Sequence, residues 1–284
     1  RSKALSAIER GKVFVNDVEQ TVADAARRLQ AGETVRLWMD RPGSAERRYS
    51  ERREAGLHLL YEDSSLLVIN KPAGLLTVPL PSQPAEPSLV DQLKHHLRSH
   101  KKMEPLVVHR IDRDTSGIVI FAKNHEAQRK LQDQFEQRKA ERVYLALVYG
   151  HPKPESGTWR DYLLWNQDSL KQQPAERRDR NAKEAVCRYR TLEKFPGAAL
   201  IEVSLVTGKR NQIRVQAALR GHPLVGEKKY VYDPAPQPRI EFARQALHAH
   251  RLAFKHPVNQ RPMNFEAQAP EDFQSLLETL KTRK

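Results

Sequence analysis

One stretch of the chain places a carboxylate between two arginines. Asp112 lies between Arg110 and Arg113 within residues 108–124, and an apolar run at 117–122 predicts a buried strand directly after it. Neighbouring cations favour the charged form of a carboxylate, whereas desolvation at the mouth of a strand disfavours it. Such a group suits a nucleophile or a base that acts on an electron-poor centre of an anionic substrate. A purely structural ion-pair loop is the alternative interpretation.

Other familiar chemistries lack their motifs in this sequence. There is no Gly-x-x-x-x-Gly-Lys-Ser/Thr loop, no Gly-x-Gly-x-x-Gly turn that opens a helix, and no His-Glu-x-x-His. Cys187 is the single cysteine, which excludes an internal disulfide framework and any multi-cysteine metal site. His95-His96 and the pair His248 and His250 could be metal ligands, but structural or RNA-facing roles suit them better. We therefore expect neither a cofactor nor a metal.

The charge of the chain favours a polyanionic partner. The 284 residues include 49 Lys and Arg against 35 Asp and Glu, a formal net charge of +14. No apolar run approaches the length of a membrane span, and residues 1–12 lack the apolar stretch of a secretory signal, so we expect a soluble cytoplasmic monomer. Residues 94–102 hold a basic run without a carboxylate, which predicts phosphate contacts or, alternatively, a solvated helix face. Its members are Lys94, His95, His96, Arg98, His100, Lys101 and Lys102.

Apolar periodicity predicts the elements that must hold these residues. Ser88 and Asn124 can cap two helices, and a third is expected at 271–280. Strands are expected at 57–61, 66–69, 117–122, 143–148, 185–192, 200–206, 248–254 and 263–267. Residues 166–183 are polar and predict an exposed loop. Because strands outnumber helices without alternating with them, we expect an α+β fold with a mixed, largely antiparallel sheet and flanking helices.

The composition also suggests three segments. Residues 1–40 form a small α+β unit, 41–56 form a charged linker that contains Pro42-Gly43, and 57–284 form the catalytic domain.

Several motifs in order resemble those of one enzyme family. Residues 109–117 read His-Arg-Ile-Asp-Arg-Asp-Thr-Ser-Gly and resemble the His-Arg-Leu-Asp-x-x-Thr-Ser-Gly motif of pseudouridine synthases of the large-ribosomal-RNA and tRNA type, with Ile111 in place of Leu. Further blocks resemble that family at 68–74, 142–150, 207–215, 221–226 and 245–249. The resemblance covers about residues 57–284.

The resemblance implies roles for individual residues. Asp112 matches the catalytic aspartate, Tyr144 the active-site tyrosine, and Arg214 the basic residue that pairs with the aspartate. Arg110 matches the arginine that enters the RNA stack when the target uridine leaves it. The RNA-binding residues expected on this basis and from the basic run are Arg110, Arg113, Lys71, Lys209, Arg210, Lys101 and Lys102.

The chemistry agrees with these roles. Isomerisation of uridine breaks the bond from N1 to C1′, turns the base, and joins C5 to C1′. Because uracil can leave as a delocalised anion, no cofactor is needed. Asp112 could attack the ribose or remove a ribose proton, and the sequence leaves both routes open. A uridine in paired RNA must be flipped out to meet a carboxylate, and a guanidinium plane such as that of Arg110 could fill the gap.

The sequence departs from the family pattern at two places. Residues 209–211 read Lys-Arg-Asn where Arg-Thr/Ser-His is usual, and Gln216 replaces a histidine. We expect these positions beside the phosphate-facing region, where they would affect RNA contacts more than the chemistry. The first 40 residues resemble the small RNA-binding domain named after ribosomal protein S-four, in partial form.

We thus interpret the chain as a cofactor-free pseudouridine synthase for structured RNA, either ribosomal RNA or tRNA. The alternatives are a noncatalytic RNA-binding or assembly protein that retains the synthase fold, and a nucleic-acid glycosylase that would release free base.

Overall fold

The computed structural model describes residues 2–9, 12–38, 52–54, 57–98, 104–232 and 240–282. The chain divides into two compact units, Arg1–Glu54 and Ala55–Lys284, called here the N-terminal and C-terminal units. None of the helices in these described ranges has both the length and the apolar character that crossing a bilayer requires.

The N-terminal unit contains a three-stranded sheet with the order β2-β1-β3. The strands β1 and β2 are antiparallel and meet at Asn16-Asp17, two residues with positive φ, which suits a tight hairpin turn. The elements are α1 (Ser2–Glu9), β1 (Val13–Val15), β2 (Val18–Glu19), the 3-10 helix η1 (Val22–Ala26), β3 (Val35–Leu37) and β4 (Arg52–Glu54). The last of these lies within the predicted linker 41–56, most of which is outside the described residues.

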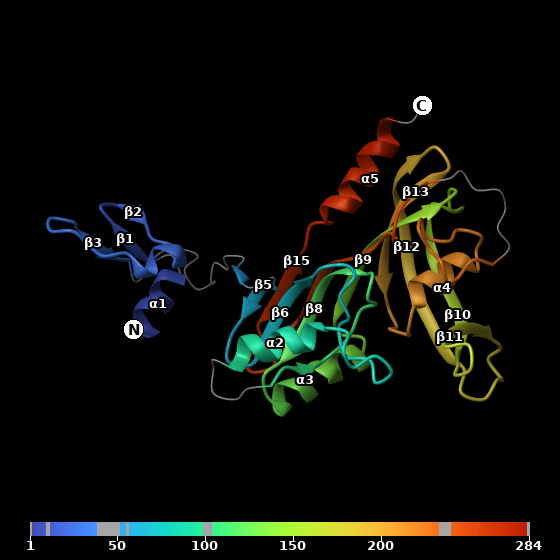
Figure 1. The fold of residues 1–284 in the computed structure, drawn as a ribbon, viewed down its shortest axis with the longest axis horizontal. Helices are drawn as coiled ribbons and strands as arrows, with labels where there is room; N and C mark the ends of the chain where they lie inside the picture. Colours follow the sequence, from blue (N-terminus) through green and yellow to red (C-terminus); the bar gives the residue numbers. More distant parts are fainter. Residues whose placement is uncertain are drawn as a thin grey trace. The chain divides into compact units, whose positions relative to one another are not determined.

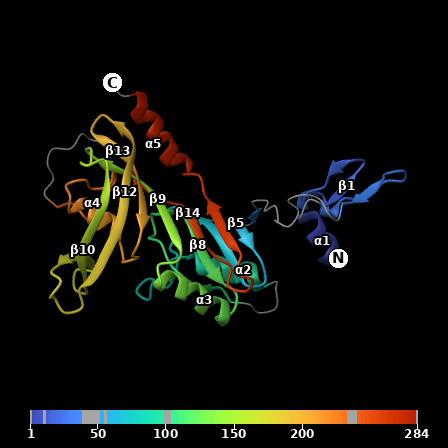
Figure 2. The same cartoon turned by 180° about the vertical axis from the view of Figure 1, so that it is seen from behind.

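One large sheet forms the frame of the C-terminal unit (Figure 1). Its strand order is β11-β10-β12-β13-β9-β14-β8-β6-β5, with β15 paired to β14 and β7 paired to β8. Only the pair β14 and β8 is parallel among the described pairings of these strands, which confirms the mixed, largely antiparallel sheet. In Figure 2, β14 lies between β9 and β8 at the centre of this sheet. The strands are β5 (Leu57–Glu62), β6 (Leu66–Lys71), β7 (Leu106–Val107), β8 (Ser116–Ala122), β9 (Glu141–Tyr149), β10 (Ser156–Asn166), β11 (Lys171–Ala175), β12 (Lys183–Phe195), β13 (Ala198–Leu205), β14 (Leu247–Lys255) and β15 (Pro262–Glu266).

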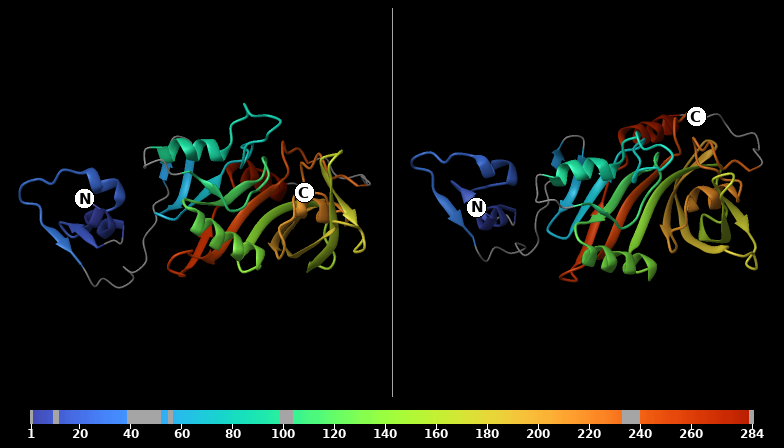
Figure 3. Two further views of the ribbon diagram at one scale, coloured as in Figure 1. Left: turned by 90° about the horizontal axis from the view of Figure 1, so that it is seen from below. Right: turned by 60° about the horizontal axis from the view of Figure 1, so that its bottom comes forward.

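Two helices cover opposite faces of the half of the sheet that contains β5, β6 and β8 (Figure 3, left). On one face, Leu89, Leu93 and Leu97 of α2 (Leu89–Arg98) are fully buried in the largest apolar cluster. On the other face, α3 (His125–Glu136) buries Leu131 in a second cluster. The predicted caps are present, since Ser88 and Asp91 bond each other at the start of α2 and Asn124 Oδ1 accepts from Ala127 N.

The other half of the sheet carries α4 (Gln212–Ala218) and α5 (Glu271–Thr282) (Figure 1). Val215 and Ala218 of α4 pack with Leu163 of β10, and Phe273 of α5 packs with Leu147 of β9. The short helix α4 therefore packs on the half of the sheet that contains β10 and β12.

The prediction of an exposed loop at residues 166–183 is partly wrong. Residues 171–175 form β11, which pairs with β10 in an antiparallel hairpin. Only Gln172 of β11 is buried, so no apolar alternation marks this edge strand in the sequence. Neither β10 nor the seven-residue helix α4 was predicted from the apolar pattern.

Gly117 permits the close approach of the two parallel strands at the centre. Its φ is +113°, and a Cβ there would lie 2.2 Å from the backbone oxygen of Ala249. No other residue type fits this position without movement of the backbone. The turn before Gly117 is the one that carries Asp112.

Candidate active site

The loop between β7 and β8 carries Asp112, and hydrogen bonds to its backbone carbonyls hold it in place. Thr77 Oγ1 donates to the carbonyl of Ile111 at 2.7 Å, and the backbone N–H of Thr115 donates to the carbonyl of Asp112 at 3.1 Å. The backbone N–H of Gly74 donates to the carbonyl of Arg113 at 3.0 Å. These bonds on both sides hold the Asp112 backbone in one place.

Lys71 has a structural role, so its predicted role in RNA binding is wrong. Its side chain is fully buried, and Nζ donates to the carbonyls of Pro72, Leu75 and Arg113 at 2.7 to 2.8 Å. Burial lowers its pKa to about 7, opposed by the charges of Asp114 and Asp112. Lys71 therefore anchors the loop that carries Asp112 and has no exposed surface to offer to a nucleic acid.

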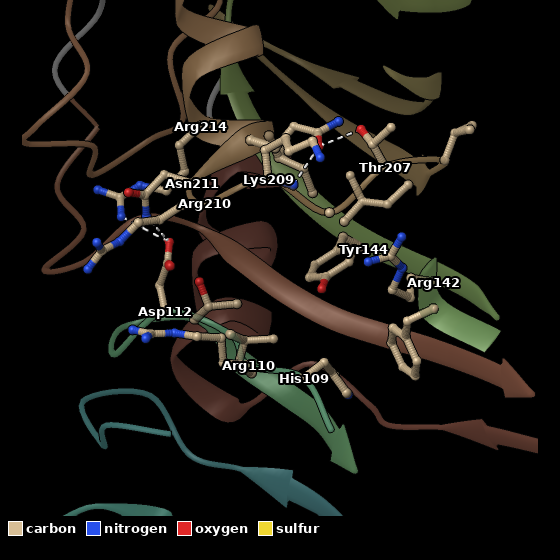
Figure 4. A pocket seen from close by; sticks show the side chains of 18 of the residues that line it. His109, Arg110, Asp112, Arg142, Tyr144, Thr207, Lys209, Arg210, Asn211 and Arg214 are labelled. Atoms are coloured by element: carbon tan, nitrogen blue, oxygen red, sulfur yellow. Dashed lines mark hydrogen bonds and ion pairs between the residues drawn. The ribbon is translucent and has the colours of Figure 1, made fainter. Parts of the chain in front are cut away.

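The carboxylate of Asp112 is bound through one of its two oxygens (Figure 4). Oδ2 accepts from Arg214 Nη1 at 3.1 Å and from Asn211 Nδ2 at 2.6 Å. Oδ1 has no hydrogen-bond partner among the residues that the structure describes. The predicted pairing of Arg214 with Asp112 is therefore present, and one oxygen remains available to a substrate.

A second carboxylate holds Arg214 in place. Glu227 accepts from Arg214 Nε and Nη2, both at 2.7 Å, and the Glu227 side chain is almost completely buried. Burial would lower the pKa of Arg214, but the hydrogen bond and charge of Glu227, followed by those of Asp112, raise it above the usual value. Burial would likewise raise the pKa of Glu227, yet Arg214 brings it below its ordinary value. The two form a bidentate pair, and a third N–H group of Arg214 reaches Asp112.

A pocket of about 540 Å³ opens beside Asp112 (Figure 4). Tyr144 of β9 forms part of its wall, is 7% exposed, and has its pKa raised by burial. The side chain of Tyr144 and that of Asp112 thus face one cavity although they lie on different elements. Its charged and polar lining residues are His109, Arg110, Asp112, Thr115, Glu136, Arg138, Arg142, Tyr144, Thr207, Lys209, Arg210, Asn211, Gln212 and Arg214.

Four cations in this lining have no carboxylate partner in the described part of the chain. They are Arg110, Arg142, Lys209 and Arg210. Burial, with the neighbouring charge of Arg210, lowers the pKa of Arg110. Arg142 Nε is buried without a hydrogen-bond partner, and the Arg210 guanidinium lies 3.9 Å from the ring centroid of Trp165. The pocket therefore carries positive charge that the described residues do not neutralise.

Of the remaining predicted RNA-binding residues, the structure describes only Arg113. Arg113 points away from the pocket lining and pairs with Glu86 at 2.7 Å, so it does not flank the Asp112 carboxylate as its position in the sequence suggested. Lys101 and Lys102 fall outside the described residues. Within the same basic run, His96 Nε2 lies 2.9 Å from Glu62.

The histidines considered as metal ligands have protein partners. His248 is buried between Ser116 Oγ and the carbonyl of Ala267, both at 2.9 Å, and His250 Nδ1 lies 2.8 Å from that carbonyl. Within the described residues, no three His, Cys, Asp or Glu side chains are grouped so that they could hold a metal ion.

Sequence reasoning missed three residues that surround Asp112, namely Asn211, Glu227 and Tyr230. Asn211, one of the departures from the family pattern that were expected to affect RNA contacts more than the chemistry, bonds Asp112 directly. Gln216 lies deep inside, where it bonds Cys187, Gln212 and Asp161. The sequence offered one signal for the position of Asn211. It lies three residues before Arg214, so that Asn211 caps α4 and Arg214 lies in its first turn.

Comparison with known proteins assigns the fold and the site to a family. The family model described as RNA pseudouridylate synthase matches residues 65–219, more than half of the chain. The chain belongs to the RNA pseudouridine synthase family. With that family it is an isomerase, and the matched residues contain Asp112, Tyr144 and Arg214.

Individual synthases resemble this one over most of its length. An uncharacterized RNA pseudouridine synthase of Bacillus subtilis is 34% identical over 99% of this chain and 89% of its own. Ribosomal large subunit pseudouridine synthase D of Zymomonas mobilis is 34% identical over 87% of this chain and 78% of its own. The solved structure of human RNA pseudouridylate synthase domain containing 4 has a TM-score of 0.63 and 25% identity, and the match covers 78% of this synthase and 92% of that chain.

His109, the first residue of the synthase motif, is a partly buried structural group. Nε2 accepts from the backbone N–H of Ile120 at 3.1 Å, and the ring stacks on Phe135 with centroids 4.7 Å apart. Burial, followed by the charge of Arg142, lowers its pKa to about 3. The imidazole is therefore neutral in the folded synthase and joins the loop that carries Asp112 to β8.

This neutral histidine predicts a loss of stability in acid. Below about pH 6.5 the unfolded chain binds a proton at His109 that the folded chain does not bind until about pH 3, so stability falls as the pH falls through this window. The contribution approaches about 1.4 kcal/mol per pH unit. We expect urea unfolding of the His109→Gln variant between pH 6 and 4 to show a pH slope smaller by about that amount.

The buried His248, whose pKa burial lowers to about 4, gives wild type and variant a shared background slope. Identical slopes for the two proteins would contradict the account of His109.

Proposed function

We propose that this synthase converts particular uridines of ribosomal RNA to pseudouridine without a cofactor, with Asp112 as the catalytic carboxylate and with the target base flipped into the pocket. The observation that carries the proposal is the free Oδ1 of Asp112, which faces a cavity while Oδ2 is held by Arg214 and Asn211. Relatives named as ribosomal large subunit synthases support ribosomal RNA as the substrate. That substrate would place the protein in the cytoplasm.

The reaction balances with the groups of this chain alone. The N1–C1′ bond breaks and uracil departs with the electron pair, while Oδ1 of Asp112 either bonds to C1′ or removes a ribose proton. The base then turns and C5 bonds to C1′; on the first route the Oδ1–C1′ bond breaks as it does so, and on the second Asp112 returns the ribose proton. The hydrogen of C5 is lost as a proton, and N1 gains a proton. Arg214 keeps a full positive charge beside the carboxylate, so that Asp112 enters the reaction as an anion.

The pocket suits an extrahelical uridine. Its volume of about 540 Å³ leaves room for a nucleotide, and Tyr144 offers a buried aromatic wall against which a uracil ring can pack. A uridine inside paired RNA could not reach Asp112, since the carboxylate belongs to the lining of this cavity.

The cations without carboxylate partners provide the attraction for RNA. Arg110, Lys209 and Arg210 line the cavity, and Arg210 is supported by the face of Trp165 instead of an acidic side chain. Guanidinium groups that remain unpaired can bind phosphate or stack on an unpaired base. This arrangement supports Arg110 as the group that takes the place of the departed uridine.

The alternative, a noncatalytic RNA-binding or assembly protein, would not need an aspartate with one free oxygen. A glycosylase would release uracil, whereas a synthase releases none. A single-turnover assay that measures both pseudouridine and free uracil in large-subunit ribosomal RNA distinguishes these functions. The proposal predicts pseudouridine without free uracil.

The Asp112→Asn variant tests the role of the carboxylate. Its amide oxygen can still accept from Arg214 and Asn211, and Glu227 still neutralises Arg214, so we expect folding and RNA affinity to stay close to wild type. The single-turnover rate should fall more than about a thousandfold, equivalent to roughly 4 kcal/mol. Substantial turnover by the pure variant would refute the assignment of Asp112.

Arg210 tests the origin of RNA affinity. For Arg210→Ala, we expect weaker RNA binding and a log-affinity against log-salt slope that is flatter by about 0.7 to 0.9, because one phosphate contact is lost. The matched control is Arg190→Ala, which removes an exposed arginine whose charge Glu202 already neutralises at 2.8 Å. Equal slopes for the two variants would show that Arg210 does not bind phosphate.

The N-terminal unit is proposed as an RNA-binding module that adds affinity without contributing to the chemistry. Residues 1–55 carry twelve Lys and Arg against nine Asp and Glu, so any contribution must come from basic residues on one face. Deletion of residues 1–55 should weaken RNA binding and leave the single-turnover rate at saturating RNA unchanged. If the deletion leaves RNA affinity unchanged, the N-terminal unit does not bind RNA. If the single-turnover rate at saturating RNA collapses, the boundary between the two units is misplaced.

A further inference from the structure

A chain of hydrogen bonds reaches Asp112 from the edge of the sheet. Asn211 Nδ2 donates to Asp112 Oδ2 at 2.6 Å, and the Tyr230 hydroxyl donates to Asn211 Oδ1 at 2.9 Å. The same hydroxyl accepts from the backbone N–H of Gln172 in β11 at 3.1 Å. Because the backbone N–H of Gln172 donates a hydrogen bond to the Tyr230 oxygen, the hydroxyl hydrogen of Tyr230 points to Asn211.

This order of donors fixes the orientation of the Asn211 amide. A carboxylate accepts hydrogen bonds only, so Asp112 requires the NH₂ side of Asn211. If the amide turned over, its oxygen would face the Asp112 carboxylate and its NH₂ group would face a hydroxyl already supplied with a donor. Tyr230 therefore selects the arrangement in which Asn211 donates to Asp112.

Tyr230 is itself held firmly. Its side chain is fully buried with Leu163 and Val215, and the Arg214 guanidinium lies 5.3 Å from its ring centroid. Burial raises the pKa of Tyr230, which preserves its proton as a donor. Its backbone N–H donates to Glu227 Oε1 at 3.2 Å, so residues 227 to 230 hold both donors to Asp112: Glu227 holds Arg214, and Tyr230 holds Asn211.

We propose that Tyr230, acting through Asn211, is a positioning residue that keeps Oδ2 of Asp112 occupied and leaves Oδ1 to the substrate. This inference rests on the proposed function. Tyr230 lies outside residues 65–219, the part of the chain that the family model matches. The β10–β11 hairpin supplies the Gln172 amide at the far end of the relay.

The first test compares two tyrosine-to-phenylalanine variants in single-turnover assays on in vitro transcribed large-subunit ribosomal RNA. Tyr230→Phe removes the donor to Asn211, and we expect the rate at saturating RNA to fall roughly threefold to tenfold, with RNA affinity unchanged. Tyr189→Phe is the control, since it removes another buried hydroxyl, bonded to the carbonyl of Pro154 at 2.7 Å, that has no path to Asp112. Thermal unfolding of both variants verifies that they are folded.

The second test uses pH. Asn211→Asp places a second carboxylate against Asp112, and like charges favour the protonated form, so the acid limb of the rate profile should move to higher pH by about one unit or more. The titratable and charged groups that interact with Asp112 are Lys71, Arg110, Tyr144, Arg214, Lys229 and Tyr230, all retained in this variant. A residue with a purely structural role would leave the pH profile where it is.

Different outcomes separate the two proposals. A Tyr230→Phe variant as fast as Tyr189→Phe, or an unshifted profile for Asn211→Asp, overturns the positioning role while the proposed function stands. A wild-type protein that forms no pseudouridine in any RNA overturns the proposed function and this inference with it.

Discussion

A single, largely buried guanidinium links the parts of the candidate active site. Arg214 gives two N–H groups to Glu227 and a third to Asp112, so one cation is shared by two carboxylates. Breaking such a buried pair by removing one partner leaves an uncompensated charge, which is far more costly than the net stabilisation of the intact pair. The site therefore requires Glu227 as much as Asp112, although Glu227 does not line the pocket.

The sheet brings these groups together from distant positions. Asp112 precedes β8, Tyr144 lies on β9, and Arg214 belongs to α4, which packs against β10 and β12. The close parallel contact of β8 with β14, permitted by Gly117, sets the position of the loop before β8. Two side chains then hold that loop. Lys71 donates to three backbone carbonyls, one of which belongs to the loop. His109 accepts from the backbone N–H of Ile120 in β8. Rigid placement of this kind allows a single carboxylate to act without large rearrangement.

Much of the frame could be predicted from the sequence, because its signals are local. The buried strands β6 and β8 contain continuous apolar runs, and the capping residues Ser88 and Asn124 mark where α2 and α3 begin. The motif around Asp112 is contiguous, so its role could be inferred from resemblance. Lys71 was misjudged because nothing in a lysine's neighbours along the chain shows that three carbonyls will enclose it.

Tertiary contacts account for the residues that sequence reasoning missed. Tyr230 and Gln172 are 58 residues apart, and their hydrogen bond exists only because β11 pairs with β10 and α4 packs against that half of the sheet. The strand β11 has a single buried side chain, too little for a periodic signal. Asn211 was visible as a departure from the family pattern, but its direction toward Asp112 follows from its left-handed backbone at the start of α4.

The most direct test of the central claim is a crystal structure of the Asp112→Asn variant bound to its RNA substrate. The account predicts an unstacked uridine in the pocket against Tyr144, with its ribose C1′ nearest the side-chain atom at the Oδ1 position of residue 112. The other side-chain atom should accept from Arg214 and Asn211, as Oδ2 does in the free protein. A uridine that stays stacked in the RNA outside the pocket, or a ribose that faces the Oδ2 position, would contradict the account.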